Sequence, residues 1–185
     1  SKFLVRPMGI FQLIDYVGID VVRYILSVMD PYNPGENLHS KLLDELFDKG
    51  VKGGQHPDGS QKDGFLKYEE GRPMAIFSPS LDDYVAISEY RAACDTHLGP
   101  VPGSMPKWKE VVGDPDKEEK LRAYFSDLAS MDTLGARLAG EYLQRSREIG
   151  QQLVRDHIAH MEKDVNTVLL TGFFHAYGPI NDYMS

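Results

Sequence analysis

Three histidines near the carboxyl end are the first residues whose spacing suggests chemistry. His157 and His160 lie one helical turn apart, Glu162 follows closely, and His175 comes later. Neutral imidazoles on one helix face are common zinc ligands. The spacing is three residues, however, not the four of His-Glu-x-x-His, and no acidic general base lies between them. We therefore predict no metal site and interpret these histidines as surface or capping residues; a zinc-dependent hydrolase is the weaker alternative.

Cys94 and His97 have the types of a nucleophile and its base. No residue is evident that would orient the imidazole, so we interpret Cys94 as a structural thiol. As the only cysteine, it excludes an internal disulfide and fits a reducing compartment, which predicts a cytoplasmic protein.

Charge excludes some partners and leaves others open. The formal net charge of −8 argues against non-specific binding of nucleic acid, which needs a basic field. No apolar run is long enough to span a membrane, so we predict no membrane partner. Lys52, Lys62 and Lys67 lie in or beside a glycine-rich stretch and could meet the phosphates of a small anionic ligand. A solvated loop is the simpler interpretation of that stretch.

Apolar periodicity predicts that the elements holding these residues are mostly helices. Residues 50–64 are rich in glycine and cannot form regular structure, and residues 65–77 are typical of a short β-hairpin. Ser80 is expected to cap one of the helices, with Asp83 three residues on. The predicted helices cover residues 8–29, 38–49, 81–95, 114–129, 131–161 and 163–171.

A dinucleotide-binding fingerprint is missing from the chain. No Gly-x-Gly-x-x-Gly run follows a predicted strand. We therefore predict that this chain binds no NAD by itself.

Two runs carry a family resemblance. Residues 6–20 read Arg-Pro-Met-Gly-Ile-Phe-Gln-Leu-Ile-Asp-Tyr-Val-Gly-Ile-Asp. This run resembles the Pro-x-Gly-Pro-Phe-x-Leu-x-Asp-x-x-Gly-x-Asp signature of the C-terminal helical domain of 3-hydroxyacyl-CoA dehydrogenases, although Ile10 replaces the second proline. Residues 50–68 resemble the Gly-x-Lys-x-Gly-x-Gly-Phe-Tyr-x-Tyr run that closes that domain; they keep Gly64, Phe65 and Tyr68 and carry an insertion around residues 56–59. The matching positions, which we interpret as structural, are Pro7, Gly9, Phe11, Asp15, Gly18, Asp20, Gly64, Phe65 and Tyr68.

The resemblance implies a fold and a domain organisation. The expected fold is all-α, similar to the 6-phosphogluconate dehydrogenase C-terminal-like fold, with one short β-hairpin. Residues 1–78 would be one copy of the helical domain, truncated at its start. Residues 79–185 would be a helical extension, for which a degenerate second copy is one interpretation, packed with the first as one globule. The stretch from Gly172 to Asp182 echoes the start of the chain and is the sign of that second copy.

The resemblance also implies a function. Family members oxidise a 3-hydroxyacyl-CoA to a 3-ketoacyl-CoA with NAD, a reaction of fatty-acid metabolism and β-oxidation. Their catalytic His–Glu pair lies on an N-terminal nucleotide-binding domain, and an Asn comes from the first helix of the helical domain. This chain has no asparagine between Asn37 and Asn166, so that Asn cannot be placed on helix 131–161. We therefore expect a fragment of such an enzyme that has no catalytic residue and is inactive alone.

The resemblance further implies partners. These are the N-terminal nucleotide-binding domain, an acyl-CoA substrate and a second copy in a homo-oligomer. Candidate substrate-binding residues are Phe11 and Ile14 on the apolar first helix, with Lys52 and Lys62 for the CoA phosphates. A purely core role of that helix is the competing interpretation. A stand-alone, non-catalytic helical interaction module is the alternative function.

Overall fold

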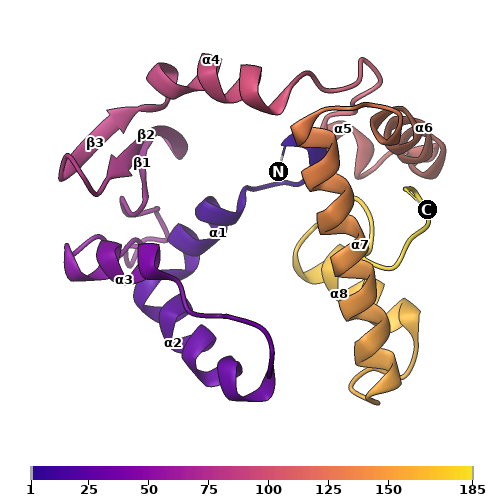
Figure 1. The fold of residues 1–185 in the computed structure, drawn as a ribbon, viewed down its shortest axis with the longest axis horizontal. Coiled ribbons are helices and arrows are strands. Elements are labelled where there is room, and N and C mark those ends of the chain that lie inside the picture. The colour runs from indigo at the N-terminus through magenta and orange to yellow at the C-terminus, as the bar shows by residue number, and fades with distance from the viewer. Residues whose placement is uncertain (1, 185) are drawn as a thin grey trace. The chain divides into compact units, whose positions relative to one another are not determined.

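The computed structural model describes residues 2–184 and divides into two compact units (Figure 1). Unit 2 is continuous and runs from Met8 to Ala92. Unit 1 comprises the chain up to Pro7 and the chain from Ala93 onward. Unit 2 is therefore an insertion within the sequence of unit 1. Among the described residues, no helix is long and apolar enough to cross a membrane.

Unit 2 begins with two helices where the periodicity predicts one. Helix α1 spans Ile10–Val17 and α2 spans Ile19–Met29. Gly18 separates them with a φ of 104°, a value that favours glycine, and the amide of Ile19 donates to the carbonyl of Lys52 at 2.8 Å. The prediction of one unbroken helix was wrong because this long-range hydrogen bond replaces a helical one.

The third helix of unit 2, α3, spans Lys41–Asp48 and lies beside α2 (Figure 1). The side chain of Ser40 caps it by accepting from the amide of Leu43, so its predicted start at residue 38 was slightly early. Its apolar face packs into a small core with residues from α2, from the loop after α3 and from the sheet. The buried members of this core are Ile19, Leu43, Leu46, Val51 and Phe77.

A three-stranded antiparallel sheet completes unit 2. Its strands are β1 Leu66–Glu69, β2 Arg72–Ser78 and β3 Asp83–Ala86, in that order. The predicted hairpin is confirmed as β1 and β2. The helix expected from residue 81 was wrong over its first turns, because residues 83–86 pair with β2. Helix α4, Ile87–Leu98, starts only after that strand and leads from unit 2 into unit 1.

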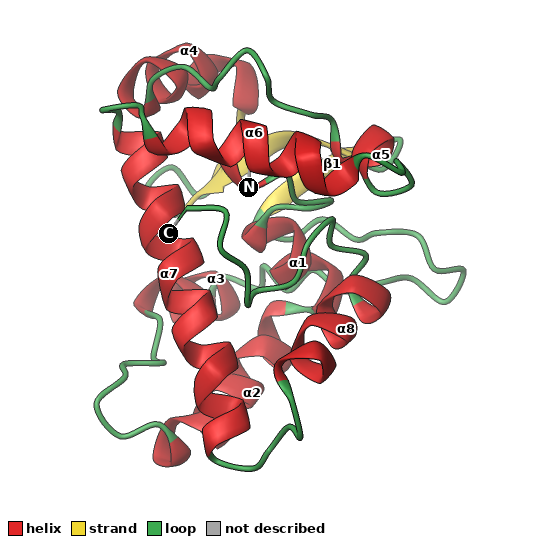
Figure 2. Ribbon diagram, turned by 90° about the vertical axis from the view of Figure 1, so that its right-hand side faces the viewer, coloured by secondary structure: helices red, strands yellow, loops and turns green. Residues whose placement is uncertain are grey.

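Unit 1 contains four further helices, and Figure 2 shows α6 lying across α7. They are α5 Trp108–Val111, α6 Lys117–Ala129, α7 Leu134–Arg155 and α8 Glu162–Gly172. Helix α6 starts at Lys117, three residues after the predicted Asp114 cap; that carboxylate accepts from the amide of Asp116. Thr133 caps α7 by accepting from the amide of Ala136 at 3.2 Å.

The core of unit 1 is rich in aromatic rings. Phe125 lies at its centre, with the rings of Tyr124, Tyr177 and Tyr183 at centroid distances of 5.0 to 5.5 Å. Residues Lys2–Arg6, called the N-terminal strap below, contribute Phe3 and Val5 to the same core. Trp108 packs at the edge of this core and its indole donates to the carbonyl of Phe174 at 2.7 Å.

Candidate functional site

The carboxylate of Asp15 is the polar centre of unit 2. It lies on α1 and is fully buried. One of its oxygens accepts from the amide of Phe65 at 2.7 Å, and the other accepts from the amide of Leu66 at 2.8 Å. The hydroxyl of Tyr68 donates to the second oxygen at 3.2 Å. The first signature run is thus joined directly to the second run, fifty residues later.

Glycines allow the backbone to approach Asp15 this closely. A Cβ at Gly64 would lie 2.3 Å from a carboxylate oxygen of Asp15, and one at Gly53 would lie 2.8 Å from its carbonyl oxygen. The same carbonyl accepts from the amide of Gly54 at 2.7 Å and from the side chain of Gln61 at 3.0 Å. The carbonyl of Asp15 therefore binds the glycine-rich segment that composition predicted to be irregular, and its carboxylate binds the residues that directly follow that segment.

Burial raises the pKa of the Asp15 carboxyl above its ordinary value. The amides of Leu66 and Phe65 and the hydroxyl of Tyr68 oppose that shift, because they stabilise the carboxylate. The pKa of the Tyr68 hydroxyl is itself raised, by burial and by the neighbouring Asp15 charge. These three groups all donate to one fully buried carboxylate, which suits a structural role.

The other signature residues lie around this centre. The ring of Phe11 packs on the ring of Phe65 with centroids 4.4 Å apart. The amide of Gly9 donates to the side chain of Gln12 at the start of α1. Asp20 is exposed in the first turn of α2 and accepts only from the adjacent amide of Val21 among the described contacts.

The candidate substrate-binding residues occupy different environments. Phe11 and Ile14 are half-buried, and Ile14 packs against the core of unit 2. The ammonium of Lys52 lies 5.3 Å from the ring centroid of Phe47. The backbone amide of Lys62 donates to the carbonyl of Gly54, and its side chain is exposed. The structure does not gather these four side chains into one cavity.

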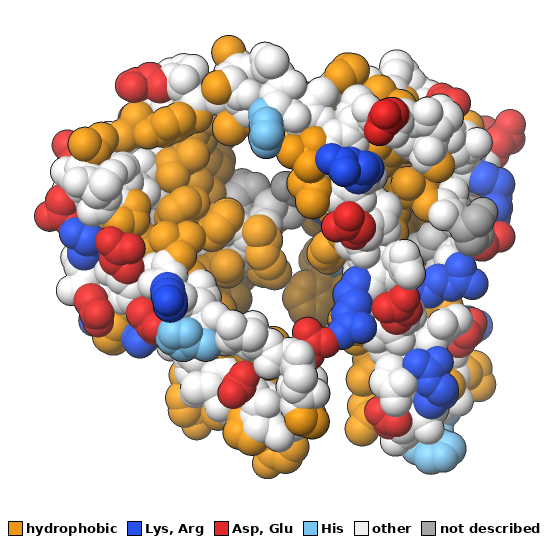
Figure 3. All heavy atoms as spheres, viewed as in Figure 1, with side chains coloured by type: hydrophobic (Ala, Val, Ile, Leu, Met, Phe, Trp, Pro, Cys, Tyr) orange, Lys and Arg blue, Asp and Glu red, His pale blue; other side chains and the backbone are white. Residues whose placement is uncertain are grey.

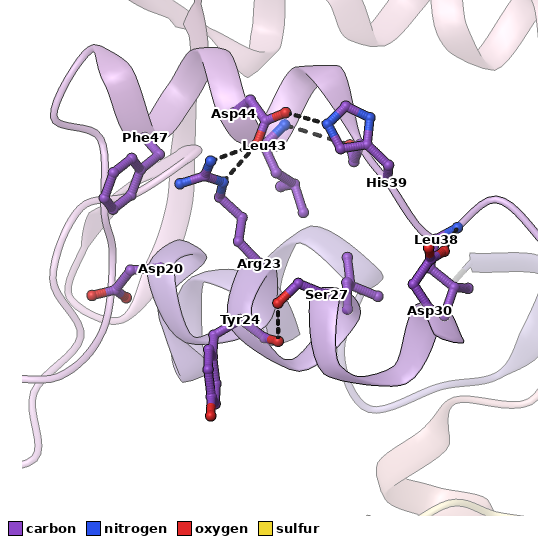
Figure 4. Close-up of a pocket in the computed structure, with 12 residues that line it drawn as sticks. Asp20, Arg23, Tyr24, Ser27, Asp30, Leu38, His39, Leu43, Asp44 and Phe47 are labelled. Carbon is purple, nitrogen blue, oxygen red and sulfur yellow. Dashed lines mark hydrogen bonds and ion pairs between the residues drawn. The ribbon is translucent and has the colours of Figure 1, made fainter. Parts of the chain in front are cut away.

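An open cleft of about 610 Å³ lies elsewhere in unit 2, between α2, the following loop and α3. Arg23 and His39 approach the carboxylate of Asp44 from two sides (Figure 4). The Arg23 guanidinium lies 2.7 Å from one carboxylate oxygen, and His39 Nε2 lies 2.5 Å from the other. The side chains that line the cleft are those of Asp20, Arg23, Tyr24, Leu26, Ser27, Asp30, Leu38, His39, Ser40, Leu43, Asp44 and Phe47.

Two hydrogen-bond donors determine the electrostatics around Asp44 in this cleft. The hydrogen bond from Arg23, followed by that from His39, holds the pKa of Asp44 below its ordinary value. The guanidinium of Arg23 also lies 4.4 Å from the ring centroid of Phe47. Sequence reasoning missed this cleft, because its charged residues belong to separate elements and follow no motif spacing.

The residues weighed for a metal site do not form one. Over the described residues 2–184, no group of three histidine, cysteine or carboxylate side chains could hold a metal ion. His175 lies in unit 1, where its Nδ1 is buried without a protein hydrogen-bond partner. Burial and the nearby Arg6 charge lower the pKa of His175 to about 4. Cys94 is exposed on α4.

Large apolar side chains are exposed along α1 and α2, and Figure 3 shows hydrophobic side chains gathered over the end of α2. Ile10 is 65% exposed, Tyr24 is 70% exposed and Tyr32 is 80% exposed. An apolar set of this extent is typical of an interaction surface rather than of free solvent-facing helices. We call it the α1–α2 apolar face; its members are Met8, Ile10, Tyr16, Val17, Val21, Tyr24, Ile25, Val28, Met29 and Tyr32.

Comparison with known proteins agrees with the signature. Residues 2–68 match the family described as 3-hydroxyacyl-CoA dehydrogenase, C-terminal domain. This stretch contains both runs joined by Asp15, and the mostly helical fold of the chain is consistent with that domain. No curated protein and no solved structure matches the chain.

Proposed function

We propose that this chain is the substrate-binding and dimerisation domain of an NAD-dependent 3-hydroxyacyl-CoA dehydrogenase. The family match over residues 2–68 carries the proposal. The reaction is the oxidation of a 3-hydroxyacyl-CoA to a 3-ketoacyl-CoA in fatty-acid metabolism. The hydride would pass to NAD on a separate nucleotide-binding domain, which would also supply the general base. The contribution of this chain is to bind and position the acyl-CoA.

Substrate contact is assigned to the two half-buried residues of α1 and to two exposed lysines. Phe11 and Ile14 offer apolar surface to an acyl chain, and Lys52 and Lys62 offer positive charge to the CoA phosphates. The lysines arise from the glycine-rich segment that Asp15 binds. The role of Asp15 in this proposal is therefore to hold the segment that carries them.

Direct binding tests this assignment. Calorimetry with a short-chain 3-hydroxyacyl-CoA should show binding to the chain, and Lys52→Glu with Lys62→Glu should weaken it at least tenfold. Lys107→Glu with Lys109→Glu, on the exposed surface of unit 1, is the matched control and should leave it unchanged. The chain with NAD and substrate should form no NADH. Equal affinity of the two double variants would contradict the substrate assignment.

The α1–α2 apolar face is assigned to a second copy of the chain. Burial of apolar area is the main favourable contribution to such association. Tyr24→Glu with Val28→Glu should convert the oligomer to a monomer in light scattering. Leu81→Glu, on a residue that is 66% exposed elsewhere in unit 2, is the control and should not alter the mass. A wild-type monomer at all concentrations would contradict this assignment.

The exposed face also supports the alternative, a stand-alone helical interaction module. The mass of the native protein in its source cells distinguishes the two functions. An antibody raised against this chain should detect a band larger than 20.8 kDa by at least a nucleotide-binding domain. A band at 20.8 kDa would favour the interaction module.

A further inference from the structure

The N-terminal strap is built into the core of unit 1. Phe3 and Val5 are 7% and 5% exposed. The ring of Phe3 lies so close to α7 that a Cβ at Gly135 would lie 2.2 Å from its Cζ atom. The strap therefore fills a space that α7 leaves for an aromatic ring.

Polar contacts hold the strap on further elements. The hydroxyl of Tyr124, on α6, donates to the carbonyl of Phe3 at 2.9 Å. The hydroxyl of Tyr177, after α8, donates to the carbonyl of Leu4 at 2.8 Å. The guanidinium of Arg6 lies 4.5 Å from the ring centroid of Tyr177. Groups from α6, α7 and the carboxyl-terminal segment thus all contact the strap.

Along the polypeptide chain, the strap is covalently connected to the remainder of unit 1 only through unit 2. The chain leaves the strap at Pro7, runs through Met8–Ala92 and returns at Ala93. When unit 2 is unfolded, docking of the strap must close a flexible loop of about 85 residues. When unit 2 is folded, most of that chain has a fixed structure, so docking of the strap restricts far less flexible chain.

We propose that the folding of unit 2 controls the docking of the strap and, through it, the stability of unit 1. Loop-closure entropy grows as three halves of the logarithm of loop length, so an effective loop that is about sevenfold shorter when unit 2 is folded favours docking on the order of 20-fold. This coupling requires only chain connectivity. A ligand that binds only folded unit 2 therefore stabilises unit 1 as well, without touching it. The inference does not depend on the identity of that ligand.

Trp108 provides the measurement, because it is the only tryptophan and lies in unit 1. Ile19→Asp with Leu46→Asp places two charges at fully buried positions in the core of unit 2 and unfolds it. Urea unfolding, monitored by Trp108 fluorescence, should then show that the equilibrium folding constant of unit 1 is lower than in the parent chain, on the order of 20-fold. Met74→Asp with Leu81→Asp, at exposed positions of unit 2, is the control and should leave it unchanged.

The strap variant Phe3→Ala shows whether the effect travels through the strap. In that background the two core charges should lower the folding constant of unit 1 several-fold less than in the parent chain. If Phe3→Ala prevents unit 1 from folding, Phe3→Leu replaces it. An unchanged Trp108 transition in the parent chain, or an equal change in both backgrounds, would overturn the proposal.

Discussion

In each unit a polar side chain binds a distant backbone segment, and the two side chains differ in chemistry and in burial, since Asp15 is fully buried and Asn166 is half-buried. In unit 2 the carboxylate of Asp15 accepts from two successive amides. In unit 1 the amide of Asn166, on α8, accepts from the amide of Ile180 and donates to its carbonyl, both at 2.9 Å. A glycine lies directly against each side chain, and a Cβ at Gly64 or Gly178 would overlap it.

The difference shows two ways to satisfy a buried backbone. Asp15 only accepts, so it suits a turn whose free groups are all amides. Asn166 both donates and accepts, so it pairs the amide and the carbonyl of Ile180, as a neighbouring β-strand would. The first arrangement buries a charge and the second buries none. Removing Asp15 should therefore cost more than removing Asn166, because its loss leaves several donors unpaired at once.

The largest expected effect is that of Asp15→Ala. The amides of Phe65 and Leu66 would lose their only described acceptor, so unit 2 should lose about 3–4 kcal/mol of unfolding free energy. Hydrogen exchange at the amides of α3, which keep their own acceptors, measures this. Asp20→Ala is the control, since Asp20 is exposed, and should cost less than about 1 kcal/mol. Equal losses would show that Asp15 is not the centre of the fold.

Alanine at the paired glycines sharpens the comparison. Gly64→Ala and Gly178→Ala each force a Cβ to within 2.2–2.3 Å of the polar side chain. We expect each to destabilise its own unit by about 2–3 kcal/mol, since neither side chain can move without losing its hydrogen bonds. Gly103→Ala, which meets open space, should change thermal unfolding little. If Gly64→Ala or Gly178→Ala changed thermal unfolding as little as Gly103→Ala does, the two centres would not share this close glycine contact.

Asn166→Asp isolates the chemical difference between the two centres. The carboxylate keeps an acceptor for the amide of Ile180 but turns a second acceptor toward its carbonyl. Unit 1 should lose about 2 kcal/mol at pH 7, measured by urea unfolding with Trp108 fluorescence. Below the pKa of the new carboxyl, the protonated group can donate again, so part of the loss should be recovered. A loss that is independent of pH would contradict this reading.

The smallest expected effect is the pH dependence due to His175. Its pKa is lowered to about 4 in the folded protein, against about 6.5 when unfolded, so the folded state binds the proton less readily. The associated stability is complete above pH 6.5 and is lost as the pH falls toward 4. Because the ring is only half-buried, we expect about 1–2 kcal/mol. His175→Gln should flatten this slope in unit 1, whereas His160→Gln, at an exposed site, should not.

Local patterns predicted most of the secondary structure. Apolar spacing located most helices of both units but not the short α5, and the turn chemistry at residues 69–72 predicted the pairing of β1 with β2. The break at Gly18 was missed, because it depends on a carbonyl at Lys52 that is distant in sequence. The third strand was missed for a related reason: residues 83–86 extend because β2 offers them a partner.

The site was predicted less completely than the fold. The family signature identified Asp15, Gly64 and Phe65 as structural positions, but no local rule indicated that the first would bind the other two. The cleft at Asp44 was not predicted, since its partners Arg23 and His39 come from different elements. Local chemistry thus indicated which residues matter, and only the tertiary contacts showed what they bind.

The span between Asp15 and Phe65 also has a kinetic consequence. Their hydrogen bond closes fifty residues of chain, and those residues include α2 and α3. Such a contact forms after the local helices, because its closure entropy must be met before it contributes energy. Asp15→Ala should therefore accelerate unfolding of unit 2 while leaving its refolding rate almost unchanged. The buried carboxylate thus forms its contacts late in folding. It therefore affects the unfolding rate of unit 2 more than its folding rate.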